Sequence, residues 1–137
     1  MSTAALRARY MADAVTTASP ARLLVMLYDK LLLDLGQAED ALGAGDRERA
    51  AERLLHAQEI VLELLSSLDL DAWDGAKGLA ALYTFLAGEL VKANVRGDVA
   101  KIVECRALVV PLRDAWQTAA EEVAQAPVGG AAAGGVA

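Results

Sequence analysis

The 137-residue sequence contains few of the residues that cross-link or interrupt a fold. It has one cysteine, Cys105, so no intrachain disulfide can form, which fits a reducing compartment. Only three prolines occur, and aromatic residues make up 4% of the chain. Strong helix formers, above all Ala and Leu, take their place. The length and composition therefore predict one compact all-α domain.

Positive charge is also scarce: 13 Lys and Arg stand against 19 Asp and Glu, a net charge of −6. Phosphate groups bind to cationic surfaces, so this balance disfavours nucleic acid and anionic membranes as partners. The longest apolar region, residues 23–35, is interrupted by Asp29, Lys30 and Asp34 and is unsuited to membrane insertion. No apolar region typical of a signal peptide follows the first charges. We expect a soluble cytoplasmic protein.

Residues that perform catalysis or bind metals are nearly absent. His56 is the only histidine, so a Ser-His-Asp site would have to be built around it. With Glu59 it forms one reversed Glu-x-x-His pair, too little for a metal's ligand shell. The acidic segment 69–75 lacks the closing Glu of a calcium loop. We therefore predict no enzyme, no cofactor and no metal; Cys105 is expected to be a partly buried thiol and His56 a surface residue.

Four long helices are predicted. The first begins at Ser19-Pro20, where Ser caps the first turn and Pro needs no hydrogen bond, and ends near Gly43 and Gly45. The second begins at Asp46, and the third and fourth span about residues 76–95 and 99–124. Their expected core residues recur every three to four positions: Leu23, Leu27, Leu31, Leu35, Leu42; Ala50, Leu54, Ala57, Val61, Leu64, Leu65, Leu68; Leu79, Leu82, Tyr83, Leu86, Leu90, Ala93; Ile102, Val109, Leu112, Trp116, Val123.

Short connections between helices of this length favour an antiparallel four-helix bundle. Pro111 lies in the middle of the fourth helix, where the missing N–H predicts a kink. The expected organisation is a mobile N-terminal cap segment over residues 1–18, in which residues 4–14 can form a short helix, a bundle over 19–125, and a disordered Gly/Ala-rich tail over 126–137.

The first helix carries more apolar surface than one core-facing stripe requires. Leu24, Tyr28 and Leu32 widen that stripe, while Met26 and Leu33 fall nearer the opposite side. The apolar arc therefore exceeds the roughly 100° that a bundle helix needs. Such a surplus favours contact with a partner polypeptide.

The second and fourth helices carry apolar pairs outside their core stripes. Leu55 and Leu62 are one heptad apart among glutamates, and Val103 and Val110 form a similar pair near Arg106. Single exposed apolar residues are ordinary, but spaced pairs on several helices favour grooves. Grooves of this kind accept amphipathic helices or segments that fold as they bind.

Four segments, taken in order, resemble the FliS family of flagellin-specific export chaperones. They are residues 10–28, with Thr17-Ala18-Ser19-Pro20 and Met26-Leu27-Tyr28; 57–64; 82–94, from Leu82-Tyr83 to Ala93-Asn94; and 112–116. Each motif is weak alone, and their shared order and spacing carry the resemblance. Two positions depart from the family's pattern: Pro111 interrupts a helix that is usually continuous, and Phe85 stands where a tyrosine is common.

The resemblance implies an antiparallel four-helix bundle that binds the C-terminal segment of newly made flagellin in the cytoplasm, prevents premature polymerisation and supports secretion by the flagellar export apparatus. Export gate components and other flagellar regulators are further candidate partners. In the family a tyrosine of the N-terminal segment covers part of the binding surface, and Tyr10 is the matching position. The predicted partner-binding residues are Tyr10, Val15, Pro20, Leu24, Tyr28, Leu55, Leu62, Asn94, Val103 and Val110. The alternatives are a bundle adaptor for another flagellar regulator, a self-associating bundle, or a bundle enzyme or metal carrier.

Overall fold

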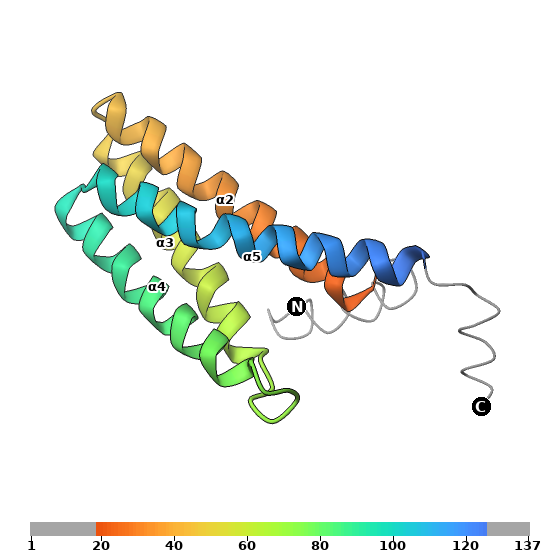
Figure 1. Ribbon diagram of the computed structural model, residues 1–137. Helices are drawn as coiled ribbons and strands as arrows, with labels where there is room; N and C mark the ends of the chain where they lie inside the picture. The colour runs from red at the N-terminus through yellow and green to blue at the C-terminus, as the bar shows by residue number, and fades with distance from the viewer. Residues whose placement is uncertain (1–18, 126–137) are drawn as a thin grey trace, which may run out of the picture. The chain divides into compact units, whose positions relative to one another are not determined.

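The computed structural model describes residues 19–125, which form four helices and no strand. The helices are α2 (Pro20–Gly43), α3 (Arg47–Ser66), α4 (Ala76–Arg96) and α5 (Val99–Gln125), joined by short connections at which the chain reverses (Figure 1). The predicted all-α helix bundle is confirmed. The expected cap segment over residues 1–18, with Tyr10 and Val15, and the Gly/Ala-rich tail lie outside the described residues. No helix of residues 19–125 is long and apolar enough to cross a membrane.

The helix ends are set by local hydrogen bonds that the sequence predicts. Ser19 Oγ accepts from Arg22 N–H at 3.1 Å, Asp46 Oδ1 from Arg49 N–H at 3.0 Å, and Asp98 Oδ1 from Lys101 N–H at 3.3 Å. Each bond satisfies an amide of a first helical turn that has no partner within its helix. α4 ends at Gly97, whose left-handed backbone (φ 62°) favours glycine.

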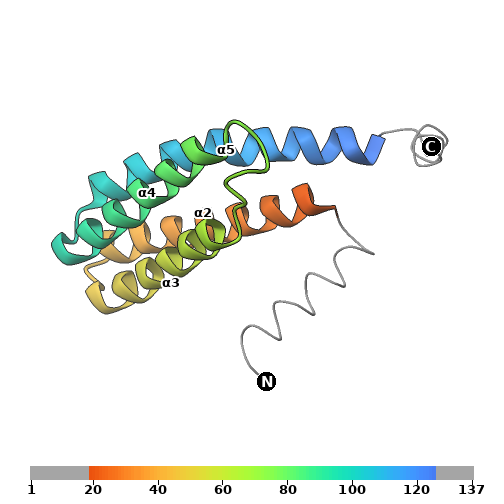
Figure 2. The same ribbon diagram turned by 90° about the horizontal axis from the view of Figure 1, so that it is seen from below.

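The chain divides into two compact units, one of which is the bundle unit, Leu27–Pro111. Its four helical segments run alternately up and down, with α3 packed against α4 (Figure 2). Apolar side chains at three- and four-residue spacing fill its interior, as expected from the pattern. The largest of those that are almost completely buried are Tyr28, Tyr83, Leu31, Leu35, Leu54, Leu64, Leu86, Leu90, Ile102, Val61 and Val109.

Polar contacts join each helix of the bundle unit to its neighbours. Arg47 Nη2 of α3 donates to the Asn94 carbonyl of α4 at 3.0 Å. Lys101 of α5 bonds Glu89 of α4 at 2.9 Å, and Arg106 of α5 bonds Glu39 of α2 at 2.6 Å. With a cluster around Asp34 that joins α2 to α3, these contacts form a closed ring around the apolar interior.

The described part of the other unit comprises residues 19–26 and 112–125. Within it, Arg22 Nη1 donates to Gln117 Oε1 at 3.0 Å, and Val25 and Ala120 are buried. Val123 was expected in the core, but this prediction is wrong because its side chain is 58% exposed. It lies near the end of α5, where each of the last five described residues is exposed.

Pro111 is accommodated inside α5, which is helical on both sides of it. Proline deprives the Ala107 carbonyl of its usual helical donor. Both Pro111 and Ala107 are exposed, so water can hydrate that carbonyl. The helix therefore tolerates the proline on its solvent side, and the expected kink stays a prediction.

Candidate functional site

The outward face of α3 carries two apolar side chains that nothing in the bundle requires. Leu55 and Leu62 are each 53% exposed and lie one heptad apart, so they project from the same face. We call these two residues the leucine strip. Exposed glutamates, Glu48, Glu52 and Glu59, share this face. The strip is therefore an apolar line within an acidic surface.

The register of α3 against α4 locates the leucine strip. The Arg47–Asn94 hydrogen bond places the start of α3 beside the end of α4. At 100° per residue, Leu55 and Leu62 lie roughly 60–80° around α3 from Arg47, toward the outside. Arg53 and His56 occupy the other flank, where they contact α2. The strip thus follows the α4 side of α3.

The outward face of α4 has the opposite charge. It exposes Lys77, Lys92 and Arg96, together with the apolar side chains of Phe85, Val91 and Val95. Glu89, the helix's one acidic residue, is half-buried and bonded to Lys101 at 2.9 Å and Lys92 at 3.2 Å. The hydrogen bond from Lys101 and then that from Lys92 lower the Glu89 pKa. The leucine strip consequently lies between an acidic and a basic helix face.

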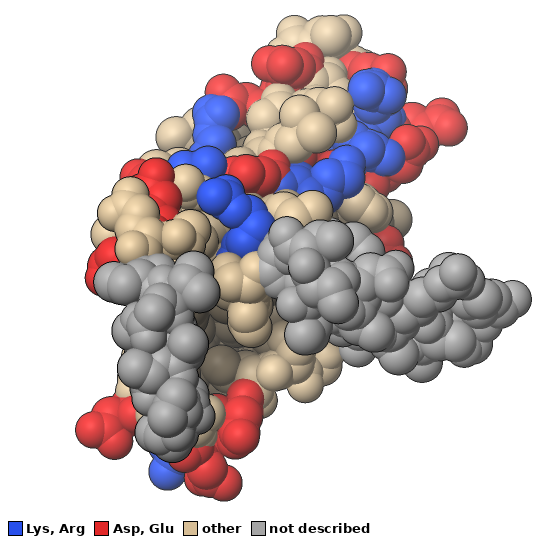
Figure 3. Space-filling model, turned by 90° about the vertical axis from the view of Figure 1, so that its right-hand side faces the viewer, with Lys and Arg blue, Asp and Glu red and all other residues tan. Residues whose placement is uncertain are grey.

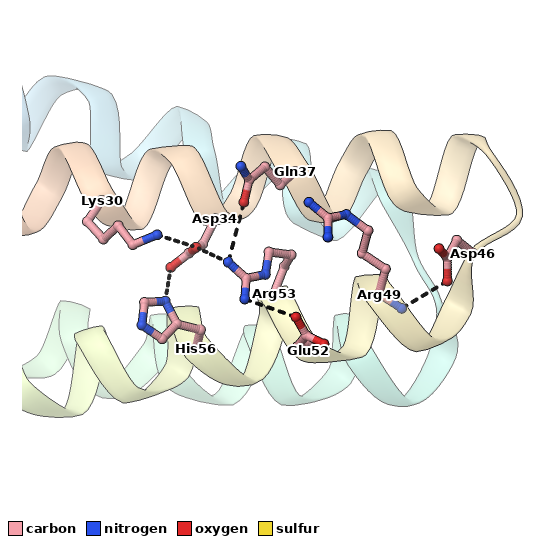
Figure 4. A network of polar contacts seen from close by, with 8 residues as sticks. All are labelled: Lys30, Asp34, Gln37, Asp46, Arg49, Glu52, Arg53 and His56. Atoms are coloured by element: carbon pink, nitrogen blue, oxygen red, sulfur yellow. Dashed lines mark hydrogen bonds and ion pairs between the residues drawn. The ribbon is translucent and has the colours of Figure 1, made fainter.

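A buried carboxylate clamps α2 to α3 (Figure 4). The Asp34 side chain is fully buried and accepts from Lys30 Nζ at 3.3 Å and Arg53 Nη1 at 3.4 Å, and His56 Nδ1 contacts its other oxygen. Arg53 also reaches Glu52 at 3.1 Å. Buried carboxylates require such partners because desolvation penalises the charge. His56 was expected simply at the surface, but it is half-buried and helps to fix this clamp.

Two tyrosines meet across the core. The hydroxyls of Tyr28 on α2 and Tyr83 on α4 are hydrogen-bonded to each other in the buried interior. Burial, and then the bond to Tyr28, raise the pKa of Tyr83. Tyr28 was predicted to bind a partner, yet it has no accessible surface in this structure. Here it stabilises the packing of α2 on α4.

The described part of the chain contains neither a cluster of metal-binding side chains nor a reactive thiol. No three His, Cys, Asp or Glu side chains between residues 19 and 125 are grouped as metal ligands. Cys105 is buried, and this burial raises the pKa of its thiol to about 11. The thiol is therefore protonated and unreactive near neutral pH.

The sequence matches the family model "Flagellar protein FliS" over residues 2–123, most of the chain. The chain belongs to the FliS family. It is 34% identical over 110 residues to the flagellar secretion chaperone FliS of Bacillus subtilis (strain 168). That alignment covers 80% of this chain and 82% of the relative. The chain is 33% identical over 107 residues to the protein of the same name from Escherichia coli (strain K12), covering 77% and 79%. These similarities confirm the resemblance to a family of export chaperones.

The residues of the bundle unit that were predicted from FliS motifs and apolar patterns do not form one patch. Within the bundle unit, Val103 and Val110 are exposed on α5, on the flank where Arg106 reaches Glu39 of α2. The leucine strip lies on the α4 side of α3 instead, and Asn94 is half-buried beside Arg47. In the other unit, Pro20 is exposed and Leu24 half-buried. The bundle of this FliS-family member therefore offers two separate apolar pairs.

The exposed apolar side chains on the outward face of α4 were not among the predicted partner-binding residues. Phe85, Val91 and Val95 are exposed beside lysines and an arginine. The signal was present, because Val91 and Val95 are four residues apart and fall off the stripe formed by Leu86, Leu90 and Ala93. Counting apolar residues outside each predicted stripe would have found them.

Proposed function

We propose that this FliS-family protein is a cytoplasmic export chaperone that binds the disordered C-terminal segment of flagellin. Binding would prevent premature polymerisation and support secretion by the flagellar export apparatus. The observation that carries the proposal is the leucine strip, two half-exposed leucines one heptad apart on a rigid helix. The names of the relatives, flagellar secretion chaperones, support the same role. The protein acts by binding and needs no catalytic group.

The energetics suit a client that must later be released. Burying apolar surface contributes about 25 cal/mol per Å². Ordering a disordered client costs roughly 1–2 kcal/mol of backbone entropy per residue. The two terms largely cancel, so the affinity is moderate for the area buried. A bundle fixed by its own core and ring of polar contacts pays little of this ordering cost itself.

The placement of the two apolar pairs suggests how the client lies. The leucine strip follows the α4 side of α3, and Val103 and Val110 follow the α2 side of α5. A client that covers both pairs extends around the bundle. An extended or partly helical segment can do so, whereas one straight helix covers a single pair.

The proposal is tested by placing a charge in the leucine strip and, separately, at an equally exposed leucine elsewhere. Leu62→Glu should weaken binding of a flagellin C-terminal peptide more than tenfold, about 1.4 kcal/mol or more. The loss combines removed apolar burial with a carboxylate that must be desolvated. Leu33→Glu on α2 is the matched control, since Leu33 is 51% exposed, and should change the affinity less than twofold.

Titration calorimetry on the full chain measures both affinities, and circular dichroism checks that helicity is unchanged. Equal affinities for the Leu62→Glu variant and the wild type would contradict the assignment of the strip. Sedimentation of the free proteins separates the self-association alternative, in which Leu62→Glu would reduce the mass of the protein without client.

A further inference from the structure

The connection between α3 and α4 exposes two large apolar side chains among acids. Leu70 and Trp73 are each about half exposed. Asp69, Asp71 and Asp74 lie between and beside them, and all three are exposed. Figure 3 shows acidic side chains gathered at its lower end, the end at which Figure 1 shows this loop. Two large apolar side chains exposed close together in one short loop form a small apolar surface that a partner can contact.

The loop is held in a defined shape by its own backbone. Asp69 accepts twice, through Oδ1 from Asp71 N–H at 2.9 Å and through its carbonyl from Ala72 N–H at 3.1 Å. The Trp73 carbonyl accepts from Ala76 N–H at 3.2 Å. These bonds form consecutive turns that lead into α4 and fix the direction of the tryptophan.

Gly75 is required for the position of the indole. A Cβ at this residue would lie 1.9 Å from the nearest ring atom of Trp73 and 2.5 Å from the next. The backbone of Gly75 has φ −79° and ψ −8°, which any residue adopts readily. Glycine is therefore needed here for the space that it leaves to the ring and not for its conformational freedom.

The result is an open pocket of about 410 Å³ lined by Leu70, Asp71, Ala72, Trp73, Asp74 and Lys77. It combines an aromatic ring with two carboxylates and one lysine, so its lining carries a net negative charge that, with the ring, favours a cation. No ion pair within the described residues engages Asp71 or Asp74. Their charge is thus available to a group from outside the chain.

We propose that this loop pocket binds an arginine or lysine side chain of a basic polypeptide segment. The cation lies against the Trp73 ring with the carboxylates of Asp71 and Asp74 beside it, and Leu70 contacts a neighbouring aliphatic group. A polypeptide fits these observations because it supplies cation and aliphatic group together, whereas the acidic loop repels nucleic acid. The site is separate from the leucine strip and does not depend on the proposed function.

The test uses the full chain carrying Trp116→Phe, so that Trp73 is the one remaining tryptophan. Hexa-arginine is titrated as the probe, and Trp73 fluorescence reports binding directly at the pocket. We expect a saturable change in emission that weakens as salt rises, because part of the attraction is between partly exposed charges. A signal that does not saturate would overturn the proposal.

Two variants and a matched control separate the pocket from general attraction to an acidic protein. Asp71→Asn with Asp74→Asn, and separately Gly75→Ala, should each weaken binding about fivefold or more, from lost ion pairs and a displaced ring. Glu121→Gln with Glu122→Gln removes the same charge from exposed positions near the end of α5 and should change the affinity less than twofold. Circular dichroism checks the fold of every variant.

Gly75→Ala is the sharper variant because it leaves the net charge unchanged. Unchanged affinity for both pocket variants would overturn the proposal. Equal weakening by the pocket pair and by the Glu121/Glu122 pair would also overturn it, since binding would then follow net charge.

Discussion

α3 and α4 lie side by side in the bundle unit, yet they present opposite chemistry to the solvent. The outward face of α3 is acidic around Leu55 and Leu62, whereas that of α4 is basic and carries exposed phenylalanine and valine. Their inward faces follow the same rule, with apolar residues at three- and four-residue spacing. The core thus constrains the two helices alike, and the difference between their outward faces is available for recognising partners.

The difference also suggests an orientation for a bound segment. A segment along the leucine strip has the glutamates of α3 on one side and the lysines of α4 on the other. Complementary charges on its two flanks would favour one direction of binding over the reverse. Apolar burial would supply affinity, and the flanking charges would select among clients.

The largest expected effect is a difference in stability between alanine substitutions at two adjacent positions of α3, one facing inward and one facing outward. Leu54 is 1% exposed and Leu55 53% exposed. Leu54→Ala should reduce the free energy of unfolding by about 2–5 kcal/mol through lost burial and a cavity. Leu55→Ala should reduce it by less than about 0.5 kcal/mol, because its side chain is largely solvated already. Urea unfolding followed by circular dichroism measures both.

The opposite outcome for the pair would show that Leu55 is a packing residue. A large loss of stability in Leu55→Ala would mean that the leucine strip serves the fold. The comparison between the outward faces of α3 and α4 would then have no bearing on partners.

A smaller effect concerns the junction that aligns the two helices. Gly97 and Gly45 both have positive φ, 62° and 76°, so alanine at either is strained by about 1–2 kcal/mol. A Cβ at Gly97 would also lie 2.0 Å from Arg47 Nη1, whereas one at Gly45 meets no atom within 4 Å. Gly97→Ala should therefore lose up to about 1 kcal/mol more than Gly45→Ala, because Arg47 must leave the Asn94 carbonyl.

Making Gly97→Ala and Gly45→Ala in a variant that also carries Arg47→Ala tests the contribution of the Arg47–Asn94 hydrogen bond. Thermal or urea unfolding should show the difference between the two glycine positions shrinking to near zero. A difference that persists without Arg47 would show that this hydrogen bond does not hold the α3–α4 alignment.

Local features were predictable from the sequence because their causes are local. Ser19, Asp46 and Asp98 cap helices through amides three residues away, and Gly97 ends α4 within the same turn. The exposure of Leu55 and Leu62 also follows from helical spacing alone. The helix boundaries and the exposure of these two leucines were accordingly predicted correctly.

Features that depend on distant residues were not predictable. In the sequence, Asp34 is a polar residue that interrupts an apolar run. In the structure it is buried, and Arg53 and His56, about twenty positions later, contact its carboxylate. From the sequence, Tyr28 was predicted to lie on the apolar surface of the first helix outside the core. In the structure its hydroxyl is hydrogen-bonded in the core to that of Tyr83, 55 positions later. Helical periodicity fixes the face on which a residue lies, and only the packing decides whether another helix covers that face.

Photo-crosslinking tests most directly whether the leucine strip touches the client. Benzoyl-phenylalanine replaces Leu62 in one full-length variant and Leu33, similarly exposed on α2, in another, and each is irradiated with flagellin. We expect a crosslink to the flagellin C-terminal segment from position 62 and none from position 33. Crosslinks of equal yield from both positions, or none from position 62, would contradict the account.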